Sequence, residues 1–140
     1  MRNLLIFIFF VLALISCKPE SNDCDYRFII LNSSNYHLDI IVFYLNSDSI
    51  PRDTLFTLNP NDEYKFEYIN RFPGNAFGLL ADSVYLIFDN TKRIIYKKDD
   101  QDPRNILLLD ACENEIENEY WYTFRYYITN EDYSNAKFIN

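Results

Sequence analysis

The residues of this 140-residue chain do not form a recognisable catalytic motif. The single histidine, His37, has no second histidine or free cysteine near it in the sequence, whereas catalytic zinc usually takes three protein ligands. Glycine occurs only twice, so the chain lacks the residues for a phosphate-binding loop or a nucleophile elbow. We therefore expect His37 to be structural or at the surface, and the protein not to be an enzyme. A small hydrolase with paired carboxylates is the weaker alternative.

Acidic residues form the most regular polar pattern. They occupy every second position of one segment, at Glu113, Glu115, Glu117 and Glu119. An extended chain would place these carboxylates on one side, where their repulsion requires water or a cation. A calcium site is one interpretation, here or at Asp99, Asp100 and Asp102, but neither segment has EF-hand spacing. A solvated loop or edge strand is the other, and we expect it, with no metal and no cofactor.

The N-terminus has the order of features found in an export signal. Arg2 precedes an unbroken apolar run over residues 4–15, and the small residue Ser16 follows it. A helix of that length would span about 18 Å, well short of the roughly 30 Å hydrocarbon core of a bilayer. We therefore expect residues 1–16 to be a cleaved signal peptide.

The chain has three cysteines, Cys17, Cys24 and Cys112. Export would place Cys24 and Cys112 in a compartment that permits disulfides. Cys24 precedes the first predicted strand and Cys112 follows a late one. A bridge between them would close a long loop, worth up to about 4 kcal/mol in the chain-entropy model. Two unpaired thiols are the alternative, because spacing in sequence does not show that the two Cα atoms are within bonding range.

The composition favours strands over helices and disfavours nucleic acid as a partner. The net charge is −8, with no basic stripe to contact phosphates. Tyr and Phe number twelve each, and such side chains suit a pleated, half-buried surface. Clusters of Asn and Asp replace glycine between the apolar runs, and these residues tolerate left-handed backbone. We predict strands at residues 26–31, 36–45, 54–58, 63–69, 83–88, 93–97, 105–109 and 120–128.

These strands predict an all-β domain over residues 26–140. We expect a two-layer antiparallel β-sandwich of seven to eight strands, immunoglobulin-like in general build. The run at 38–44 is apolar on both faces over its second half, which favours a central strand. The only helical turn is expected near 130–135, where Thr129 or Asn130 could cap it.

One strand is unusually aromatic. Residues 120–128 carry large rings on both faces, so one face enters the core while the other could stack on a sugar or anchor a protein. The candidate binding residues are Tyr120, Trp121, Tyr122 and Tyr126. Burial of both faces, or tyrosines tiling a solvated sheet, is the alternative that we favour.

Leu14-Ile15-Ser16-Cys17 resembles the lipobox of bacterial lipoproteins. The resemblance implies that the Cys17 thiol accepts a diacylglyceryl group and that a dedicated peptidase cuts before it. Several acyl chains make such an anchor durable, whereas a single chain holds only marginally. Residues 17–25 would then be a lipidated cysteine and a short tether.

Three other segments resemble features of lipoproteins from Bacteroidetes. Cys17-Lys18-Pro19-Glu20 is similar to their surface-export signal, although Pro19 departs from the usual pattern. Three Asp-(Ser/Thr)-aliphatic tripeptides are similar to their O-glycosylation motif, and imply modification at Ser49, Thr54 or Ser83. Residues 129–136 resemble a Thr-x-Glu-Asp-Tyr-x-x-Ala ending found in small lipoproteins with no assigned activity.

Together these features predict a lipoprotein anchored in the outer membrane, on its surface or periplasmic face. We expect a non-catalytic module that binds an envelope protein or a glycan. The alternative is a structural or assembly subunit of the envelope, which would supply a strand to a neighbour or accept one.

Overall fold

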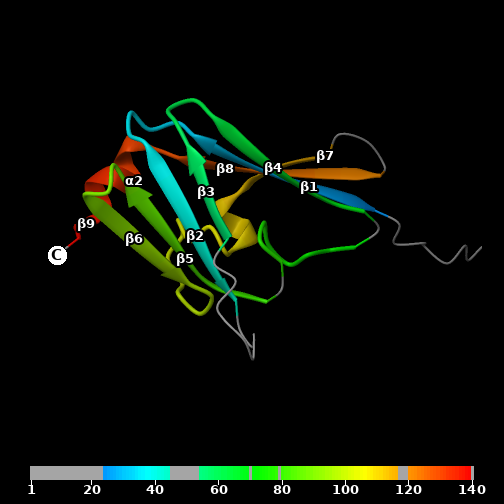
Figure 1. Cartoon of the computed structure of the whole chain (residues 1–140). Coiled ribbons are helices and arrows are strands. Elements are labelled where there is room, and N and C mark those ends of the chain that lie inside the picture. The colour runs from blue at the N-terminus through cyan, green and yellow to red at the C-terminus, as the bar shows by residue number, and fades with distance from the viewer. Residues whose placement is uncertain (1–23, 45–53, 70, 79, 117–119, 140) are drawn as a thin grey trace, which may run out of the picture.

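The computed structural model describes residues 24–44, 54–69, 71–78, 80–116 and 120–139. One layer is a four-stranded sheet of order β4-β1-β8-β7 (Figure 1). Its strands are β1 (Asp25–Asn32), β4 (Glu63–Tyr68), β7 (Glu113–Ile116) and β8 (Trp121–Ile128). β4 and β7 run antiparallel to their neighbours, whereas β1 and β8 are parallel. This layer is called sheet A below.

The second layer, sheet B, has the order β3-β2-β5-β6-β9 and is antiparallel throughout. Its strands are β2 (Leu38–Tyr44), β3 (Thr54–Leu58), β5 (Ala81–Phe88), β6 (Lys92–Lys97) and β9 (Lys137–Phe138). The predicted two-layer β-sandwich is therefore confirmed, although the parallel β1–β8 pair makes it predominantly rather than wholly antiparallel. The described residues form nine strands rather than seven to eight, and β2 is central, as its two apolar faces predicted.

One predicted strand is wrong. Residues 105–109 form turns that lead into the 3-10 helix η1 (Leu109–Ala111). The buried Asn105 side chain causes this, because its Nδ2 donates to the carbonyls of Lys97 (2.8 Å) and Asp100 (2.9 Å) and its Oδ1 accepts from Leu107 N (3.0 Å). The acidic segment supplies a strand in its place, the short, exposed edge strand β7, and β9 is the further strand beyond the predicted eight.

Asparagine and aspartate supply the turns, as the composition predicted. Asn61, Asp89 and Asn90 all have positive φ, at 69°, 46° and 55°. Asp89 and Asn90 are the two central residues of the tight turn between β5 and β6, which is closed by a 2.9 Å bond from Thr91 N to Phe88 O. Two successive left-handed residues are the signature of a type I′ turn, which matches the twist of the flanking strands.

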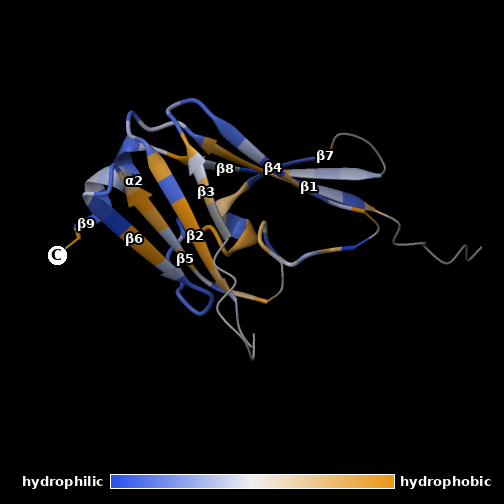
Figure 2. Ribbon diagram, in the orientation of Figure 1, coloured by the Kyte–Doolittle hydropathy of each residue, from blue (hydrophilic) through white to orange (hydrophobic). Residues whose placement is uncertain are grey.

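Stacked aromatic side chains, here called the aromatic ladder, lie along the parallel strands β1 and β8 of sheet A and face the core. The register places Tyr26 opposite Tyr122 and Phe28 opposite Phe124. Both pairs stack, with ring centroids 5.6 Å and 4.9 Å apart. From sheet B, the alternate residues of β2 and β5 complete the core, and Figure 2 shows both strands as largely hydrophobic. Among the helices of the described residues, none is long and apolar enough to cross a bilayer.

Candidate functional surfaces and a buried polar cluster

The aromatic strand β8 does not form the predicted binding surface as a unit. Tyr126 is only 2% exposed and belongs to the core, so that part of the prediction is wrong. Tyr122 is half-buried in the ladder, and Trp121 is half-buried with the Arg27 guanidinium 4.7 Å from its ring centroid. Tyr120 is 59% exposed. Of the four candidates, only Tyr120 lies largely in solvent.

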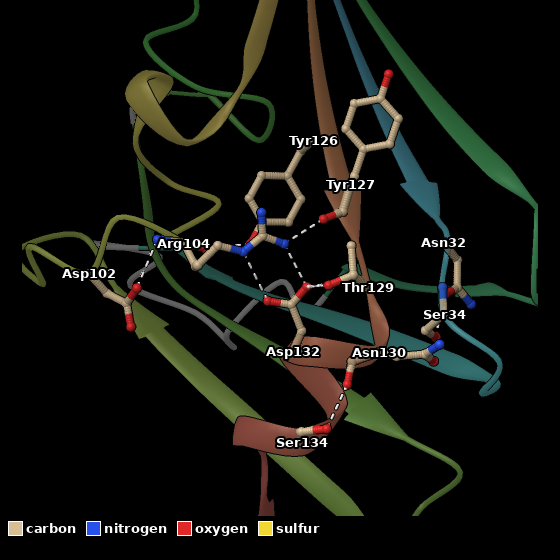
Figure 3. Close-up of polar contacts among 10 residues, drawn as sticks. All are labelled: Asn32, Ser34, Asp102, Arg104, Tyr126, Tyr127, Thr129, Asn130, Asp132 and Ser134. Carbon is tan, nitrogen blue, oxygen red and sulfur yellow. Dashed lines mark hydrogen bonds and ion pairs between the residues drawn. The ribbon is translucent and has the colours of Figure 1, made fainter.

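A buried polar cluster joins the end of β8 to the segment before η1 (Figure 3). The Arg104 guanidinium donates two hydrogen bonds to the Asp132 carboxylate, from Nη2 to Oδ2 (2.6 Å) and from Nε to Oδ1 (3.2 Å). The same Nη2 donates to the Tyr127 carbonyl at 2.5 Å. The Tyr126 hydroxyl donates to the Arg104 carbonyl. Each charged group thus bonds to its neighbours, and the cluster holds the segment of Arg104 to the end of β8 and to the residues that follow it, 23 to 28 positions later in the chain.

Asp132 also stabilises the N-terminus of the short helix α2 (Asn130–Asn135), of which it is the third residue. Its Oδ2 accepts from the Thr129 backbone N–H at 2.7 Å and from the Thr129 hydroxyl at 3.2 Å. The predicted helical turn at these residues, with Thr129 at its N-cap, is therefore confirmed. Both Asp132 oxygens are engaged and the side chain is buried, so this carboxylate stabilises the fold.

The C-terminal pattern Thr-x-Glu-Asp-Tyr-x-x-Ala has a structural explanation here. Beyond Thr129 and Asp132, Tyr133 stacks on Tyr36 with ring centroids 3.5 Å apart. Ala136 is buried directly after the helix. The spaced residues of the pattern therefore close one end of the sandwich, and the pattern itself does not indicate an activity.

Two core tyrosines, Tyr126 in this cluster and Tyr96 beside it, should make the free energy of unfolding depend on pH in the alkaline range. Burial is the main cause that raises the pKa of Tyr96 to about 12, and it raises the pKa of Tyr126 further. A group whose folded pKa is raised contributes stability below its unfolded pKa, near 10, that is lost as the pH rises through the folded value. We expect the urea midpoint to fall between pH 10 and pH 12, and less steeply in Tyr96→Phe. Tyr120→Phe is the exposed control; if it flattened the profile as much as Tyr96→Phe, the assignment would be wrong.

The two cysteines within the described residues, Cys24 and Cys112, are free thiols, so the disulfide alternative is corrected. Cys24 adjoins Asp25, which pairs with Trp121, whereas Cys112 adjoins Glu113, which pairs with Arg125. The cysteines therefore lie on opposite sides of β8 and several residues apart along it, at about 3.3 Å per residue. That separation exceeds the roughly 7 Å limit for a bridge. Burial raises the pKa of the Cys112 thiol to about 12.

The predicted lipidation and glycosylation sites lie partly outside the described residues, and His37 is described. Cys17 and Ser49 lie outside the described residues, as does the side chain of Thr54. Ser83 is half-buried on the central strand β5. His37 lies at the surface, with its Nε2 3.5 Å from Asp39 Oδ1. No group of three or more His, Cys, Asp or Glu side chains within the described ranges is arranged to hold a metal ion.

The outward face of sheet A carries ion pairs. Arg27 Nε lies 3.0 Å from Glu67 Oε1, across the β1–β4 pair. Arg125 Nη1 lies 2.5 Å from Glu115 Oε2, which places one carboxylate of the acidic segment beside a cation. Exposed pairs of this kind contribute little to stability, but they keep a surface hydrated. This face therefore combines ion pairs with apolar side chains, because the register also places Ile29, Leu31 and Tyr127 on it.

The outward face of sheet B is apolar, in contrast. Register places Ile41, Tyr85 and Ile95 in one row across β2, β5 and β6. Phe43 leans on Tyr85, with ring centroids 4.6 Å apart. Ile87 extends the row, and all five side chains are half-buried and outside the core cluster. We call these five residues the outer apolar face: Ile41, Phe43, Tyr85, Ile87 and Ile95.

Polar groups border the outer apolar face. Thr57 Oγ1 donates to Asp39 Oδ1 at 2.6 Å on one side. Arg93 lies on the other side, with its guanidinium 5.8 Å from the Tyr85 ring centroid. An apolar centre with a polar rim is the usual anatomy of a protein interface. The apolar run in β2 is the available sequence signal for this face, but burial between two layers accounts for that run equally well.

No family model, curated protein or solved structure matches this chain. The surfaces and the buried cluster of the domain are therefore the basis for assigning a function.

Proposed function

We propose that this protein is an exported lipoprotein of the outer membrane, anchored through Cys17, and that its domain is a non-catalytic module that binds another protein. The outer apolar face is the observation that carries the proposal. It spans three strands in register and lies on the sheet whose opposite side already forms the core. Solvated faces of antiparallel sheets usually alternate to polar residues, so a row of apolar side chains across three strands of a second face favours a partner.

The chemistry of the face favours a protein over a glycan. Three of its five residues are isoleucines, and its two rings are tilted by 51° against each other. Sugars are bound by flat exposed rings with polar groups around them, whereas aliphatic surface is stabilised by contact with other apolar side chains. Ser83 also lies on this face, opposite Phe43 and Lys97, so a glycan on Ser83 would compete with such a partner.

Photo-crosslinking in cells that express the full chain tests the face. Replacement of Tyr85 by p-benzoylphenylalanine is expected to give one discrete crosslinked protein. Tyr127 is the matched control, because it is a half-buried tyrosine whose partner in the register, Leu31, belongs to sheet A. We expect no discrete product from Tyr127, and we expect Ile41→Lys to remove the Tyr85 product without changing the unfolding midpoint. Equal products from both positions, or none from Tyr85, would refute the binding face.

Metabolic labelling with a palmitate analogue tests the anchor independently. The wild-type chain should take up the label and sediment with membranes, and Cys17→Ala should do neither. Cys24→Ala is the control, because it removes a neighbouring thiol outside the lipobox and should keep the label. Label that persisted in Cys17→Ala would overturn the anchor while leaving the crosslinking result intact.

One observation favours the structural-subunit alternative. Among the described residues, β9 pairs only with Lys92 and Arg93, so the edge of β6 from Ile94 to Lys97 is not covered by it. A surface groove lies beside this edge, lined by Arg93, Ile94, Ile95, Asn135, Lys137 and Phe138. An extended segment of a neighbour could add to β6 there through backbone hydrogen bonds. Crosslinks between copies of this chain from position 94 would favour this alternative.

A further inference from the structure

We propose that one end of the sandwich is a membrane-docking tip that rests on the phospholipid bilayer beside the anchor. The proposal rests on the Cys17 anchor of the proposed function and adds a second, non-covalent contact. We define the tip by four exposed apolar side chains at the end of sheet A where β1 begins: Ile69, Phe72, Ile116 and Tyr120.

The register brings these four residues together. Ile69 follows Tyr68, which pairs with Tyr26 at the start of β1. Ile116 ends β7 opposite Tyr122. The Tyr120 carbonyl accepts the Asp25 N–H at 2.6 Å. The Phe72 ring packs edge-on against Tyr26, with centroids 5.1 Å apart. The four thus lie at one level of the sheet, although they come from three strand ends and one loop.

Their exposure is high for apolar side chains. Ile69 and Tyr120 are each 59% exposed, Phe72 is 45% exposed and Ile116 is 65% exposed. Single exposed apolar residues are ordinary, but four at one end of a small domain form a patch that calls for a partner. The outer apolar face belongs to the other sheet, so the tip is a separate surface.

The position of the N-terminus identifies that partner as the membrane. The described chain begins at Cys24, directly before β1, so the segment from Cys17 joins the domain at the tip (Figure 1). Even fully extended, the seven residues from Lys18 to Cys24 reach only about 23 Å, at roughly 3.3 Å per residue. A lipid on Cys17 therefore keeps this end, and not the opposite end with β6 and β9, close to the bilayer.

The side chains suit the interface between water and lipid. Tyr120 and the adjacent Trp121 are of the two types that concentrate at bilayer surfaces, because each ring has an apolar body and a polar group. Ile69, Phe72 and Ile116 can bury their exposed area among acyl chains. The net charge of −8 opposes binding to anionic headgroups, so the favoured surface is a neutral phospholipid.

Trp121 is the only tryptophan of the chain and reports on the contact. The lipidated full-length protein is reconstituted into phosphatidylcholine vesicles, with and without bromine on the acyl chains. Docking predicts that Trp121 emission is shifted to the blue and strongly quenched by the brominated lipid. We expect Ile69→Asn combined with Ile116→Asn to remove most of the quenching, while the protein remains anchored. Both positions are more than half exposed, so the domain should keep its unfolding midpoint.

Phe138→Asn is the matched control, since Phe138 is 73% exposed and lies in β9 near the opposite end. It should keep the full quenching. Quenching that is absent in the anchored wild type, or unchanged in the double variant, would overturn the docking tip. If the purified wild type carried no lipid, the proposed anchor at Cys17 would be refuted. Trp121 quenching by the same vesicles, added to the unlipidated chain, would still test whether the tip binds the bilayer. Weaker quenching in anionic vesicles at low salt is also expected.

Discussion

Asp132→Ala is expected to lower the free energy of unfolding by about 2–4 kcal/mol, somewhat less than the cost of breaking a fully buried ion pair, because the Arg104 side chain is 35% exposed. The substitution leaves the Arg104 guanidinium without its carboxylate, to which Nε and Nη2 both donate. It also removes the acceptor of the Thr129 backbone N–H at the start of α2. Chemical denaturation at neutral pH measures the effect.

Glu131→Ala is the matched control for this prediction. Glu131 is the neighbouring acidic residue in the first turn of the same helix, but it is exposed. Its loss should cost no more than about 0.5 kcal/mol, from a weaker interaction with the helix dipole. Similar losses for the two variants would show that the cluster does not hold α2 to the sandwich. Arg104→Met in the Asp132→Ala background should cost less than Arg104→Met alone, because the two residues act as a pair.

Asn32→Asp is expected to have the second large effect, about 3 kcal/mol or more, although it changes the side-chain volume very little. Asn32 is fully buried at the end of β1. Its Nδ2 donates to the Tyr36 carbonyl at 2.9 Å and to the Leu58 carbonyl at 3.0 Å. Its Oδ1 accepts from Ser34 N at 3.1 Å and from Ser34 Oγ at 2.7 Å. A carboxylate keeps the acceptor but turns a second oxygen towards two carbonyls.

The pH dependence distinguishes this cause from a simple packing defect. Burial and the facing carbonyls should raise the pKa of the new carboxyl above its unfolded value near 4. A raised folded pKa gives stability that is present below the unfolded pKa and lost as the pH rises through the folded value. The variant should therefore approach wild-type stability in acid and fall behind it towards neutral pH.

Asn35→Asp provides the comparison, because Asn35 lies in the same loop with an exposed side chain. It should cost no more than about 0.5 kcal/mol, the usual range for a surface substitution, and its difference from wild type should not depend on pH in this way. A pH-independent loss in Asn32→Asp would contradict the assigned role of the Nδ2 donors.

The two proposed surfaces are compatible in one molecule. The tip lies at the free end of sheet A, where the chain leaves towards Cys17, whereas the outer apolar face lies on sheet B (Figure 1). A domain that rests on the bilayer through the tip would therefore keep the outer apolar face available to a partner. Trp121 quenching and Tyr85 crosslinking examine the two contacts separately.

Local chemistry explains what could be predicted from sequence. Asn61, Asp89 and Asn90 adopt left-handed backbone because their own side chains and sterics allow it, so their turns were visible without the fold. The cap at Thr129 is likewise local. The failed strand at 105–109 shows the limit, because the Asn105 side chain bonds to Lys97 and Asp100, and a short apolar run does not reveal such partners.

The sequence by itself predicted the strand-rich class and the positions of most turns, because each depends on neighbouring residues. Alternation along 120–128 showed that β8 has two faces, but only the tertiary structure decided that Tyr126 is core and Tyr120 is exposed. A period of two residues does not state which face another layer covers. The same reason applies to Ile41 and Tyr85, whose position on an outward face depends on where sheet A packs.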